Sequence, residues 1–159
     1  KMSKAAELAK FIGNGTRSTH PAFSANVGSA QTISANTLTT IAFDTERFDL
    51  NSDYNTTTYK FIAPVQGKYF LSFYLRINNV DVDSQYIDAR IRTTAHTYQA
   101  VYDPDKEASS DLSFITLNLA VLADMNATNE AYCTIYTTSV ASTNVDTDAS
   151  SGFFGYLVA

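Results

Sequence analysis

The segment from Tyr59 to Ile77, YKFIAPVQGKYFLSFYLRI, constrains the fold of this chain more than any other part of the sequence. Along its second half, apolar and polar side chains alternate with a period of two, as in a β-strand with one buried and one half-exposed face. Pro64 lacks an N–H group and Gly67 tolerates a positive φ, so PVQG is typical of a turn between two strands. The segment therefore predicts a sheet. The expected core face carries Tyr69, Leu71, Phe73, Leu75 and Ile77.

The composition favours one all-β domain. A chain of 159 residues is long enough to bury one sizeable core. Aromatic residues make up 13% of it, and together with abundant Thr, Val and Ile they suit a pleated sheet better than a helix. The net charge is −5 and the arginines are scattered, which argues against a nucleic-acid partner. No apolar run reaches the roughly 20 residues that span a bilayer, so we expect no membrane insertion.

Turn residues divide the chain from residue 22 onward into short strands. The segments between the strands are rich in Asn, Asp, Ser, Gly and Pro. Strands at this spacing predict a two-sheet sandwich or jelly roll. The ten predicted strands span residues 22–27, 32–34, 39–43, 47–48, 59–63, 68–78, 85–94, 112–122, 130–140 and 152–158.

Two of these predicted strands are apolar on both faces. Segment 112–122 places Ile115 and Leu117 on one face, and Phe114 and Leu122 on the other. The terminal run SGFFGYLVA has the same property. A sandwich of this size has no third layer to cover a second apolar face. We therefore expect neighbouring copies to cover it in an obligate oligomer, whose interface would bury more than about 2,000 Å².

The first residues predict a short helical root. Residues 2–12, MSKAAELAKFI, have apolar side chains at helical spacing, with Ser3 as an N-cap and Gly13 directly after. So short a helix is marginal alone in water, and it needs its own domain, sister chains or a larger particle to dock on. We interpret residues 1–15 as an attachment segment and residues 21–159 as a head. The alternative is a frayed terminal helix that is ordered by crystal contacts.

Several segments, in this order, resemble the complement C1q-like globular domain, a branch of the tumour-necrosis-factor-like jelly rolls. The resemblance covers residues 21–159. It implies a ten-stranded, two-sheet jelly roll that forms a homotrimer and acts by binding. The segments are PAFSA at 21–25, IAFDTERFD at 41–49 followed by Tyr54, YKFIAPVQGKYFLSF at 59–73, and SGFFGYLV at 151–158.

The resemblance also implies a trimer interface. In that fold one sheet lies against the three-fold axis, and here it would include residues 59–63, 112–122 and 152–158. The expected interface residues are Tyr59, Phe61, Phe114, Thr116, Asn118, Ala120, Phe154, Tyr156 and Val158.

A binding platform is a further expectation. If strand 68–78 pairs with strand 130–140, as the resemblance implies, four outward aromatic side chains become cross-strand neighbours: Phe70, Tyr74, Tyr132 and Tyr136. Grouped tyrosines predict a platform for a host-surface glycan or a partner protein. The alternative is that loops or an adjacent subunit cover them.

The Asp-rich loops allow a calcium hypothesis. Asp81 and Asp83 lie in the loop NNVDVD, and Asp103 and Asp105 lie in YDPDKEASSD. Carboxylates are ligands that calcium prefers, and some C1q-like domains bind calcium at the trimer apex. No spacing matches an EF-hand, and alternating aspartates also serve simply to solvate a loop.

The sequence offers no catalytic site. Cys133 has no second cysteine to pair with and lies in the strand-like run AYCTIYTT, so we expect a buried apolar thiol. His20 and His96 fall in no nucleophile motif. We therefore expect a protein that is not an enzyme and that needs no cofactor other than the hypothetical calcium.

The leading functional hypothesis is a virion protein. The leader MSKAAELAKFIG resembles N-terminal segments of structural proteins of marine bacteriophages. A trimeric head on a short root suits a fibre tip on the virion surface, attached to a virion neighbour through residues 1–15. Two alternatives stay open: a capsid decoration protein, and a secreted extracellular ligand of the C1q or tumour-necrosis-factor type.

Overall fold

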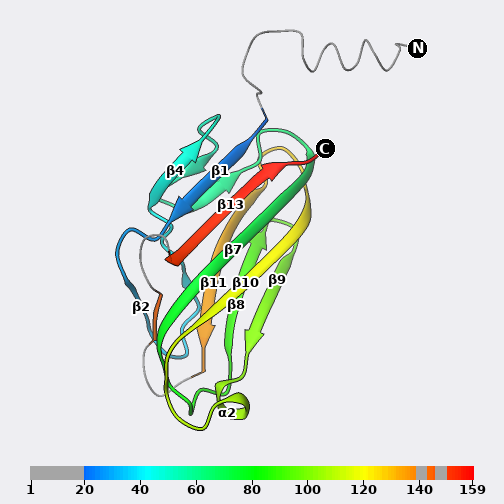
Figure 1. The fold of residues 1–159 in the computed structure, drawn as a ribbon. Helices are drawn as coiled ribbons and strands as arrows, with labels where there is room; N and C mark the ends of the chain where they lie inside the picture. Colours follow the sequence, from blue (N-terminus) through cyan, green and yellow to red (C-terminus); the bar gives the residue numbers. More distant parts are fainter. Residues whose placement is uncertain (1–19, 139–142, 146–149) are drawn as a thin grey trace, which may run out of the picture.

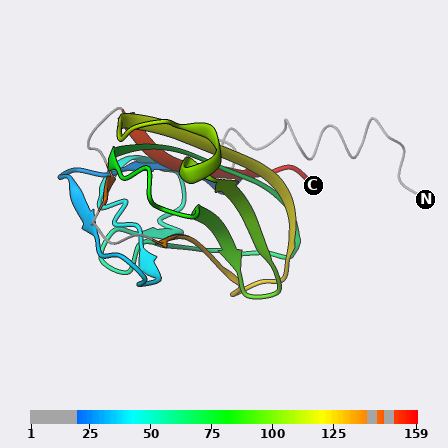
Figure 2. The same cartoon turned by 90° about the horizontal axis from the view of Figure 1, so that it is seen from below.

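The computed structural model describes residues 20–138, 143–145 and 150–159. These residues form two antiparallel sheets that pack face to face, as predicted (Figure 1). The view from below in Figure 2 shows the two layers with α2 (Pro104–Glu107), a single helical turn, at one end. Among the helices of the described part, none has both the length and the apolar character needed to cross a membrane.

Sheet A is built around its longest strands. β10 pairs with β7 along the whole of β7, while β13 and β12 pair with successive parts of β7. β1 and β4 extend the sheet beyond β13, and β2 pairs with β12. The seven strands are β1 (Ala22–Asn26), β2 (Gln31–Ile33), β4 (Thr45–Asp49), β7 (Gly67–Val80), β10 (Leu112–Met125), β12 (Thr143–Val145) and β13 (Ser151–Leu157).

Sheet B forms the second layer. Its strand order is β5-β6-β11-β8-β9, and β3 also pairs with β11. Every described pair in both sheets is antiparallel, with the long crossovers of a jelly roll. The six strands are β3 (Thr39–Thr40), β5 (Tyr54–Asn55), β6 (Lys60–Ile62), β8 (Ile87–Thr93), β9 (Thr97–Tyr102) and β11 (Glu130–Thr137).

The core lies between the sheets and follows the predicted alternation. The expected core face of β7, from Tyr69 to Ile77, is buried. Phe23 stacks on Tyr54 and Phe61, with ring centroids 5.0 Å and 4.7 Å away, and meets the edge of Phe153 at 5.0 Å. These rings come from both sheets, so they join the two layers.

Tyr54 contributes a polar group to this core. Its hydroxyl donates a hydrogen bond of 2.9 Å to the carbonyl oxygen of Phe43, which satisfies both buried groups. Burial raises the pKa of Tyr54 far above that of a free tyrosine.

The PVQG turn has a different role from the one that the sequence suggests. It links β6 in sheet B to β7 in sheet A, so it crosses between layers. Gly67 has no positive φ in this turn. Instead, an added Cβ would lie 2.5 Å from Cδ1 of Leu157 and 2.6 Å from the carbonyl oxygen of Ala159. Gly67 is therefore required by the close approach of the chain's end.

The predicted strands are largely confirmed, and three strands were missed. The long predicted strands correspond to β7, β8, β10, β11 and β13. β5 and β12 lie in segments that were expected to be turns or loops, and β9 lies in a segment for which no strand was predicted. The predicted helix at 2–12 and the last residues of the predicted strand at 130–140 lie outside the described residues.

Candidate functional site

The outer face of sheet A carries the largest exposed apolar side chains of this sheet. Phe114 and Leu122 on β10 are 57% and 58% exposed. Tyr156 on β13 and Phe48 on β4 are exposed to a similar degree, as is Val158 directly after β13. We call this surface the apolar face. An exposed apolar surface of this kind commonly marks an interaction site.

Strand register joins these side chains into continuous rows. Leu122 lies opposite Phe70, and Phe70 lies opposite Tyr156. The rings of Phe70 and Tyr156 have centroids 5.3 Å apart. In the next row, Ala120 lies opposite Ser72 and Ser72 opposite Phe154. The apolar face therefore crosses three strands without interruption.

The middle of the face is more polar. Asn118 lies opposite Tyr74, and Tyr74 lies opposite Gly152. The amide of Asn26 donates a hydrogen bond of 3.2 Å to the Tyr74 hydroxyl. Because Gly152 has no side chain, the Tyr74 ring lies directly over the backbone of β13.

Charged groups border the face at both ends. The Lys68 ammonium and the Asp124 carboxylate form an ion pair of 2.7 Å at the end where β7 begins. At the other end, the Arg76 guanidinium lies 4.5 Å from the ring centroid of Phe114. An apolar centre with a polar rim is the usual anatomy of a protein interface.

The structure brings most of the expected interface residues to this face and excludes two. The residues on or beside the face are Phe114, Thr116, Asn118, Ala120, Phe154, Tyr156 and Val158. The placement of residues 59–63 against the same sheet is wrong, because β6 belongs to sheet B. Phe61 is fully buried between the sheets, and Tyr59 lies in the turn before β6 with φ of 61°. Whether the face forms a trimer interface stays a prediction.

The expected interface left out four residues of the face: Phe48, Phe70, Tyr74 and Leu122. Phe70 and Tyr74 were assigned to a ligand platform instead, and Leu122 was identified only as an apolar side chain of its strand. The alternation along β7 contained the signal, since both side chains point away from its core face.

The pairing expected between 68–78 and 130–140 is wrong. β7 pairs only with strands of sheet A, while β11 pairs with β3, β6 and β8 of sheet B. Each of these strands buries an alternating apolar face, so the two oppose each other across the core. Phe70 and Tyr74 therefore lie on the outer face of sheet A, and Tyr132 and Tyr136 on the outer face of sheet B. The four side chains do not form one platform.

The calcium hypothesis finds no donor set in the described part of the chain. No three His, Cys, Asp or Glu side chains among the described residues come close enough to hold a metal ion. Asp81 accepts a hydrogen bond of 2.9 Å from the backbone of Asp83. Asp105 pairs with Lys106. These residues and Asp103 therefore form no calcium site within the described part of one chain, and a site shared between copies stays a prediction.

A cavity of about 500 Å³ lies at the end of the sandwich where β1 begins and β13 ends. His20, Asn51 and Asp53 supply its polar lining, and Pro64 is among its apolar residues. The Oδ2 atom of Asp53 is buried without a hydrogen-bond partner among the described residues. Burial, with the nearby charge of Asp49, raises the pKa of Asp53.

Cys133 is fully buried on the core face of β11, as expected. Burial raises the pKa of its thiol well above the usual value, so the reactive thiolate is disfavoured. His96 is exposed beside β9, with its ring 6.2 Å from that of Tyr98. Neither residue is part of a catalytic arrangement in the described chain.

Two antiparallel sheets, joined by crossovers and with an apolar outer face, define a jelly-roll binding domain. The model of the C1q domain family matches residues 22–158, and the chain therefore belongs to the C1q domain family. Domains of the C1q and tumour-necrosis-factor-like type are typically non-enzymatic binding modules.

Solved structures agree with this fold. The globular domain of zebrafish complement 1qA is similar with a TM-score of 0.65 at 14% identity, covering 88% of this chain and 98% of that one. A crystal structure of murine APRIL is similar with a TM-score of 0.65 at 5% identity, covering 88% of this chain and 100% of that one. No curated protein matches the sequence. At such low identities the two structures support the fold alone.

Proposed function

We propose that this chain is the trimeric, non-enzymatic binding head of a bacteriophage fibre, which attaches the virion to a ligand on the host surface. The observation that carries the proposal is the apolar face of sheet A. Fully burying a side chain such as Phe or Leu contributes about 1.5–3 kcal/mol. Several such side chains on the apolar face are about half exposed, so their burial between copies of the chain would strongly favour association.

Membership of the C1q domain family supports a trimer as the form of that association. Apolar contact across a three-fold axis would cover Phe114, Leu122 and Tyr156 of each copy at once. The Lys68 and Asp124 ion pair at the border would then lie at the rim, where charge contributes specificity more than affinity.

Membership of the C1q domain family supports binding rather than catalysis, because domains of this type are typically non-enzymatic binding modules. A rigid trimer presents three identical sites. Three weak contacts on one particle raise avidity by orders of magnitude without any stronger single contact.

The virion assignment rests on the leader sequence, which lies outside the described residues. Sedimentation of the purified chain tests the trimer: we expect a trimer at micromolar concentration, and a well-folded monomer would overturn the proposal. Binding to intact host cells, compared with binding to capsids that lack decoration proteins, separates a fibre tip from a capsid ornament.

A further inference from the structure

The outer face of sheet B concentrates tyrosines and cations. On β8, Arg90 and Arg92 point away from the core, since they alternate with buried Ala89 and Ile91. All members of the surface are partly exposed. We call it the tyrosine–arginine face, and it consists of Lys60, Tyr86, Arg90, Arg92, Tyr132 and Tyr136.

Aromatic rings and cations are interleaved on this face. Tyr132 on β11 lies opposite Arg92 on β8. The Lys60 ammonium lies 5.1 Å from the centroid of the Tyr132 ring, and the Arg92 guanidinium lies 5.8 Å from it. The rings of Tyr86 and Tyr136 have centroids 6.0 Å apart. The Tyr86 and Tyr136 rings therefore lie side by side, and two cations flank the Tyr132 ring on the same sheet.

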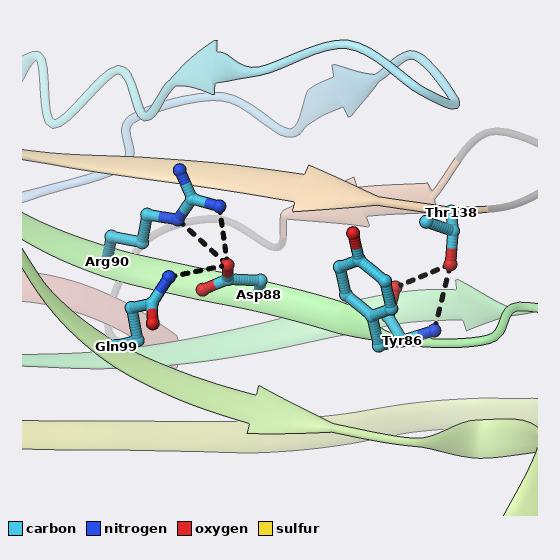
Figure 3. Close-up of polar contacts among 5 residues, drawn as sticks. All are labelled: Tyr86, Asp88, Arg90, Gln99 and Thr138. Atoms are coloured by element: carbon cyan, nitrogen blue, oxygen red, sulfur yellow. Dashed lines mark hydrogen bonds and ion pairs between the residues drawn. The ribbon is translucent and has the colours of Figure 1, made fainter.

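A buried carboxylate fixes Arg90 in place (Figure 3). Nε and Nη2 of Arg90 both donate to Oδ2 of Asp88, at 2.8 Å and 2.6 Å, and the Gln99 amide donates to the same oxygen at 3.1 Å. These bonds with Asp88 raise the pKa of Arg90. A guanidinium has five N–H donors, so most of its donors remain for a ligand.

Tyr86 is also held at the edge of the face. Its backbone N–H donates a hydrogen bond of 2.9 Å to the hydroxyl of Thr138, and that hydroxyl donates one of 3.2 Å to the carbonyl oxygen of Tyr86 (Figure 3). These two bonds hold the backbone from which the Tyr86 ring extends beside Tyr136. Preorganised side chains lose less conformational entropy on binding.

Two buried oxygen atoms on this side of the sheet lack partners. Oδ1 of Asp88 and Oγ1 of Thr134 form no hydrogen bond with the described residues. Asp88 and Thr134 are only 4% and 2% exposed. Buried polar atoms are nearly always paired, so each of these oxygens leaves a hydrogen bond unmade beneath the face.

The face also differs in charge from the rest of the chain. It and its border hold three cations, Lys60, Arg90 and Arg92, against two anions, Asp88 and Glu130, while the whole chain has a net charge of −5. Glu130 pairs with Lys60 and Asp88 pairs with Arg90. The Arg92 guanidinium contacts the Tyr132 ring but forms no side-chain hydrogen bond or ion pair with the described residues. The free cation favours an anionic ligand.

We propose that the tyrosine–arginine face binds a carboxylated sugar chain, such as a uronic-acid polysaccharide. The planar guanidinium fork of arginine matches a carboxylate. The apolar C–H faces of sugar rings would stack on Tyr132 and Tyr136, as amphipathic aromatic rings allow. This inference rests on the proposed function, to which it adds the ligand class.

Two observations favour a sugar over a protein partner. The face lacks the large aliphatic centre of a protein interface, since its exposed aliphatic side chains, Ile62 and Val101, lie on β6 and β9, which flank the two central strands β11 and β8. The tyrosine–arginine face also lies on the opposite side of the sandwich from the apolar face. In a trimer held together by the apolar face, the tyrosine–arginine face of each chain would therefore stay exposed.

Titration of the purified full chain with polygalacturonate tests the inference at about 0.15 M salt. Dextran is the neutral control, and polyglutamate supplies carboxylates without sugar rings. We expect binding to polygalacturonate only. Arg92→Gln and Tyr132→Ala should each weaken it about tenfold or more, whereas Tyr132→Phe should keep it. Lys106→Gln is the matched control for lost charge, because Lys106 lies outside the face and is largely exposed.

Equal binding of polyglutamate would overturn the inference in favour of an acidic protein partner, and equal binding of dextran would remove the role of charge. Failure to bind any of the three polymers would also overturn it. Sedimentation of the same samples separates this inference from the proposed function: a trimer that does not bind refutes the ligand class alone, while a monomer that binds refutes the trimeric head alone. Thermal melting verifies that each variant is folded.

Discussion

The Tyr74 side chain occupies the space that any side chain at position 152 would need. An added Cβ at Gly152 would lie 2.6 Å from the Tyr74 hydroxyl oxygen and 2.7 Å from the ring carbon that bears it. The two residues are direct cross-strand partners between β7 and β13. Their relationship fixes the centre of the apolar face.

Gly152→Ala should therefore destabilise the protein by about 1–3 kcal/mol, because the Tyr74 ring must leave its position. Urea unfolding measures this as a lower midpoint with an unchanged slope. The double variant with Tyr74→Ser should recover part of the loss, since it removes the clashing ring. A Gly152→Ala midpoint equal to that of the unmodified chain would show that the ring moves at no cost.

Gly155→Ala should destabilise more strongly than Gly152→Ala. Its Cβ would lie 2.8 Å from the backbone carbonyl oxygen of Phe70 and 2.7 Å from Cδ2 of Leu71. The clash at Gly155 is with the backbone of the central strand β7, which cannot shift as easily as the Tyr74 side chain that Gly152→Ala would displace. Comparison of the two variants by urea unfolding checks this order, and the reverse order would contradict the described packing of β13 on β7.

Charge on the apolar face should dissociate the proposed trimer. Phe114→Asp combined with Leu122→Asp places two carboxylates where neighbouring copies would bury them without partners. We expect a folded monomer in sedimentation at concentrations where the unmodified chain is trimeric. Val101→Asp is the matched control, since Val101 is equally exposed but lies on sheet B. Loss of the trimer in the control as well would place the interface elsewhere.

The sequence predicts the faces of strands better than their neighbours. The prediction of which residues share a face of β7, β10 and β13 is confirmed, because successive side chains along a strand point to opposite faces of the sheet. Pairing depends on the tertiary path. Nothing in the local sequence of β7 or β11 tells whether the two strands share a sheet or oppose each other across the core, and this is why the single tyrosine platform was wrong.

β9 was missed for a related reason. It alternates correctly, with Tyr98 and Ala100 packed against the core and Gln99 and Val101 outside. As an edge strand it buries its inner face only in part, so it lacks the strong apolar run that marked the central strands. The consequence extends to function, because Gln99 on β9 holds the Asp88 carboxylate beneath the tyrosine–arginine face.

Asp53→Asn should stabilise the protein at neutral pH. Burial and the Asp49 charge raise the folded-state pKa of Asp53 above the ordinary aspartate value of 3.8, so the folded protein binds a proton more tightly than the unfolded chain. Stability from this group is therefore present at low pH and is lost as pH rises from 3.8 through the raised folded pKa. The asparagine variant carries no such loss.

Melting temperature measured against pH checks this sign. The difference between Asp53→Asn and the unmodified chain should grow as pH rises from the acid range to neutrality. Asp83→Asn, at an exposed loop position, serves as the control for a lost charge. A constant difference across the pH range, or a destabilised variant at neutral pH, would contradict the desolvation of Asp53.

The thiol of Cys133 should report on unfolding and on nothing else. It is fully buried between the sheets, and burial raises its pKa, so both access and thiolate formation are suppressed in the folded chain. A thiol reagent at mildly alkaline pH should leave the native protein unmodified and label one site per chain in concentrated guanidinium, since the sequence has one cysteine. Ala95→Cys provides an exposed thiol as the positive control for reagent and pH. Rapid labelling of Cys133 under native conditions would mean that the sandwich opens at β11, because that strand pairs on both sides and holds the thiol on its core face.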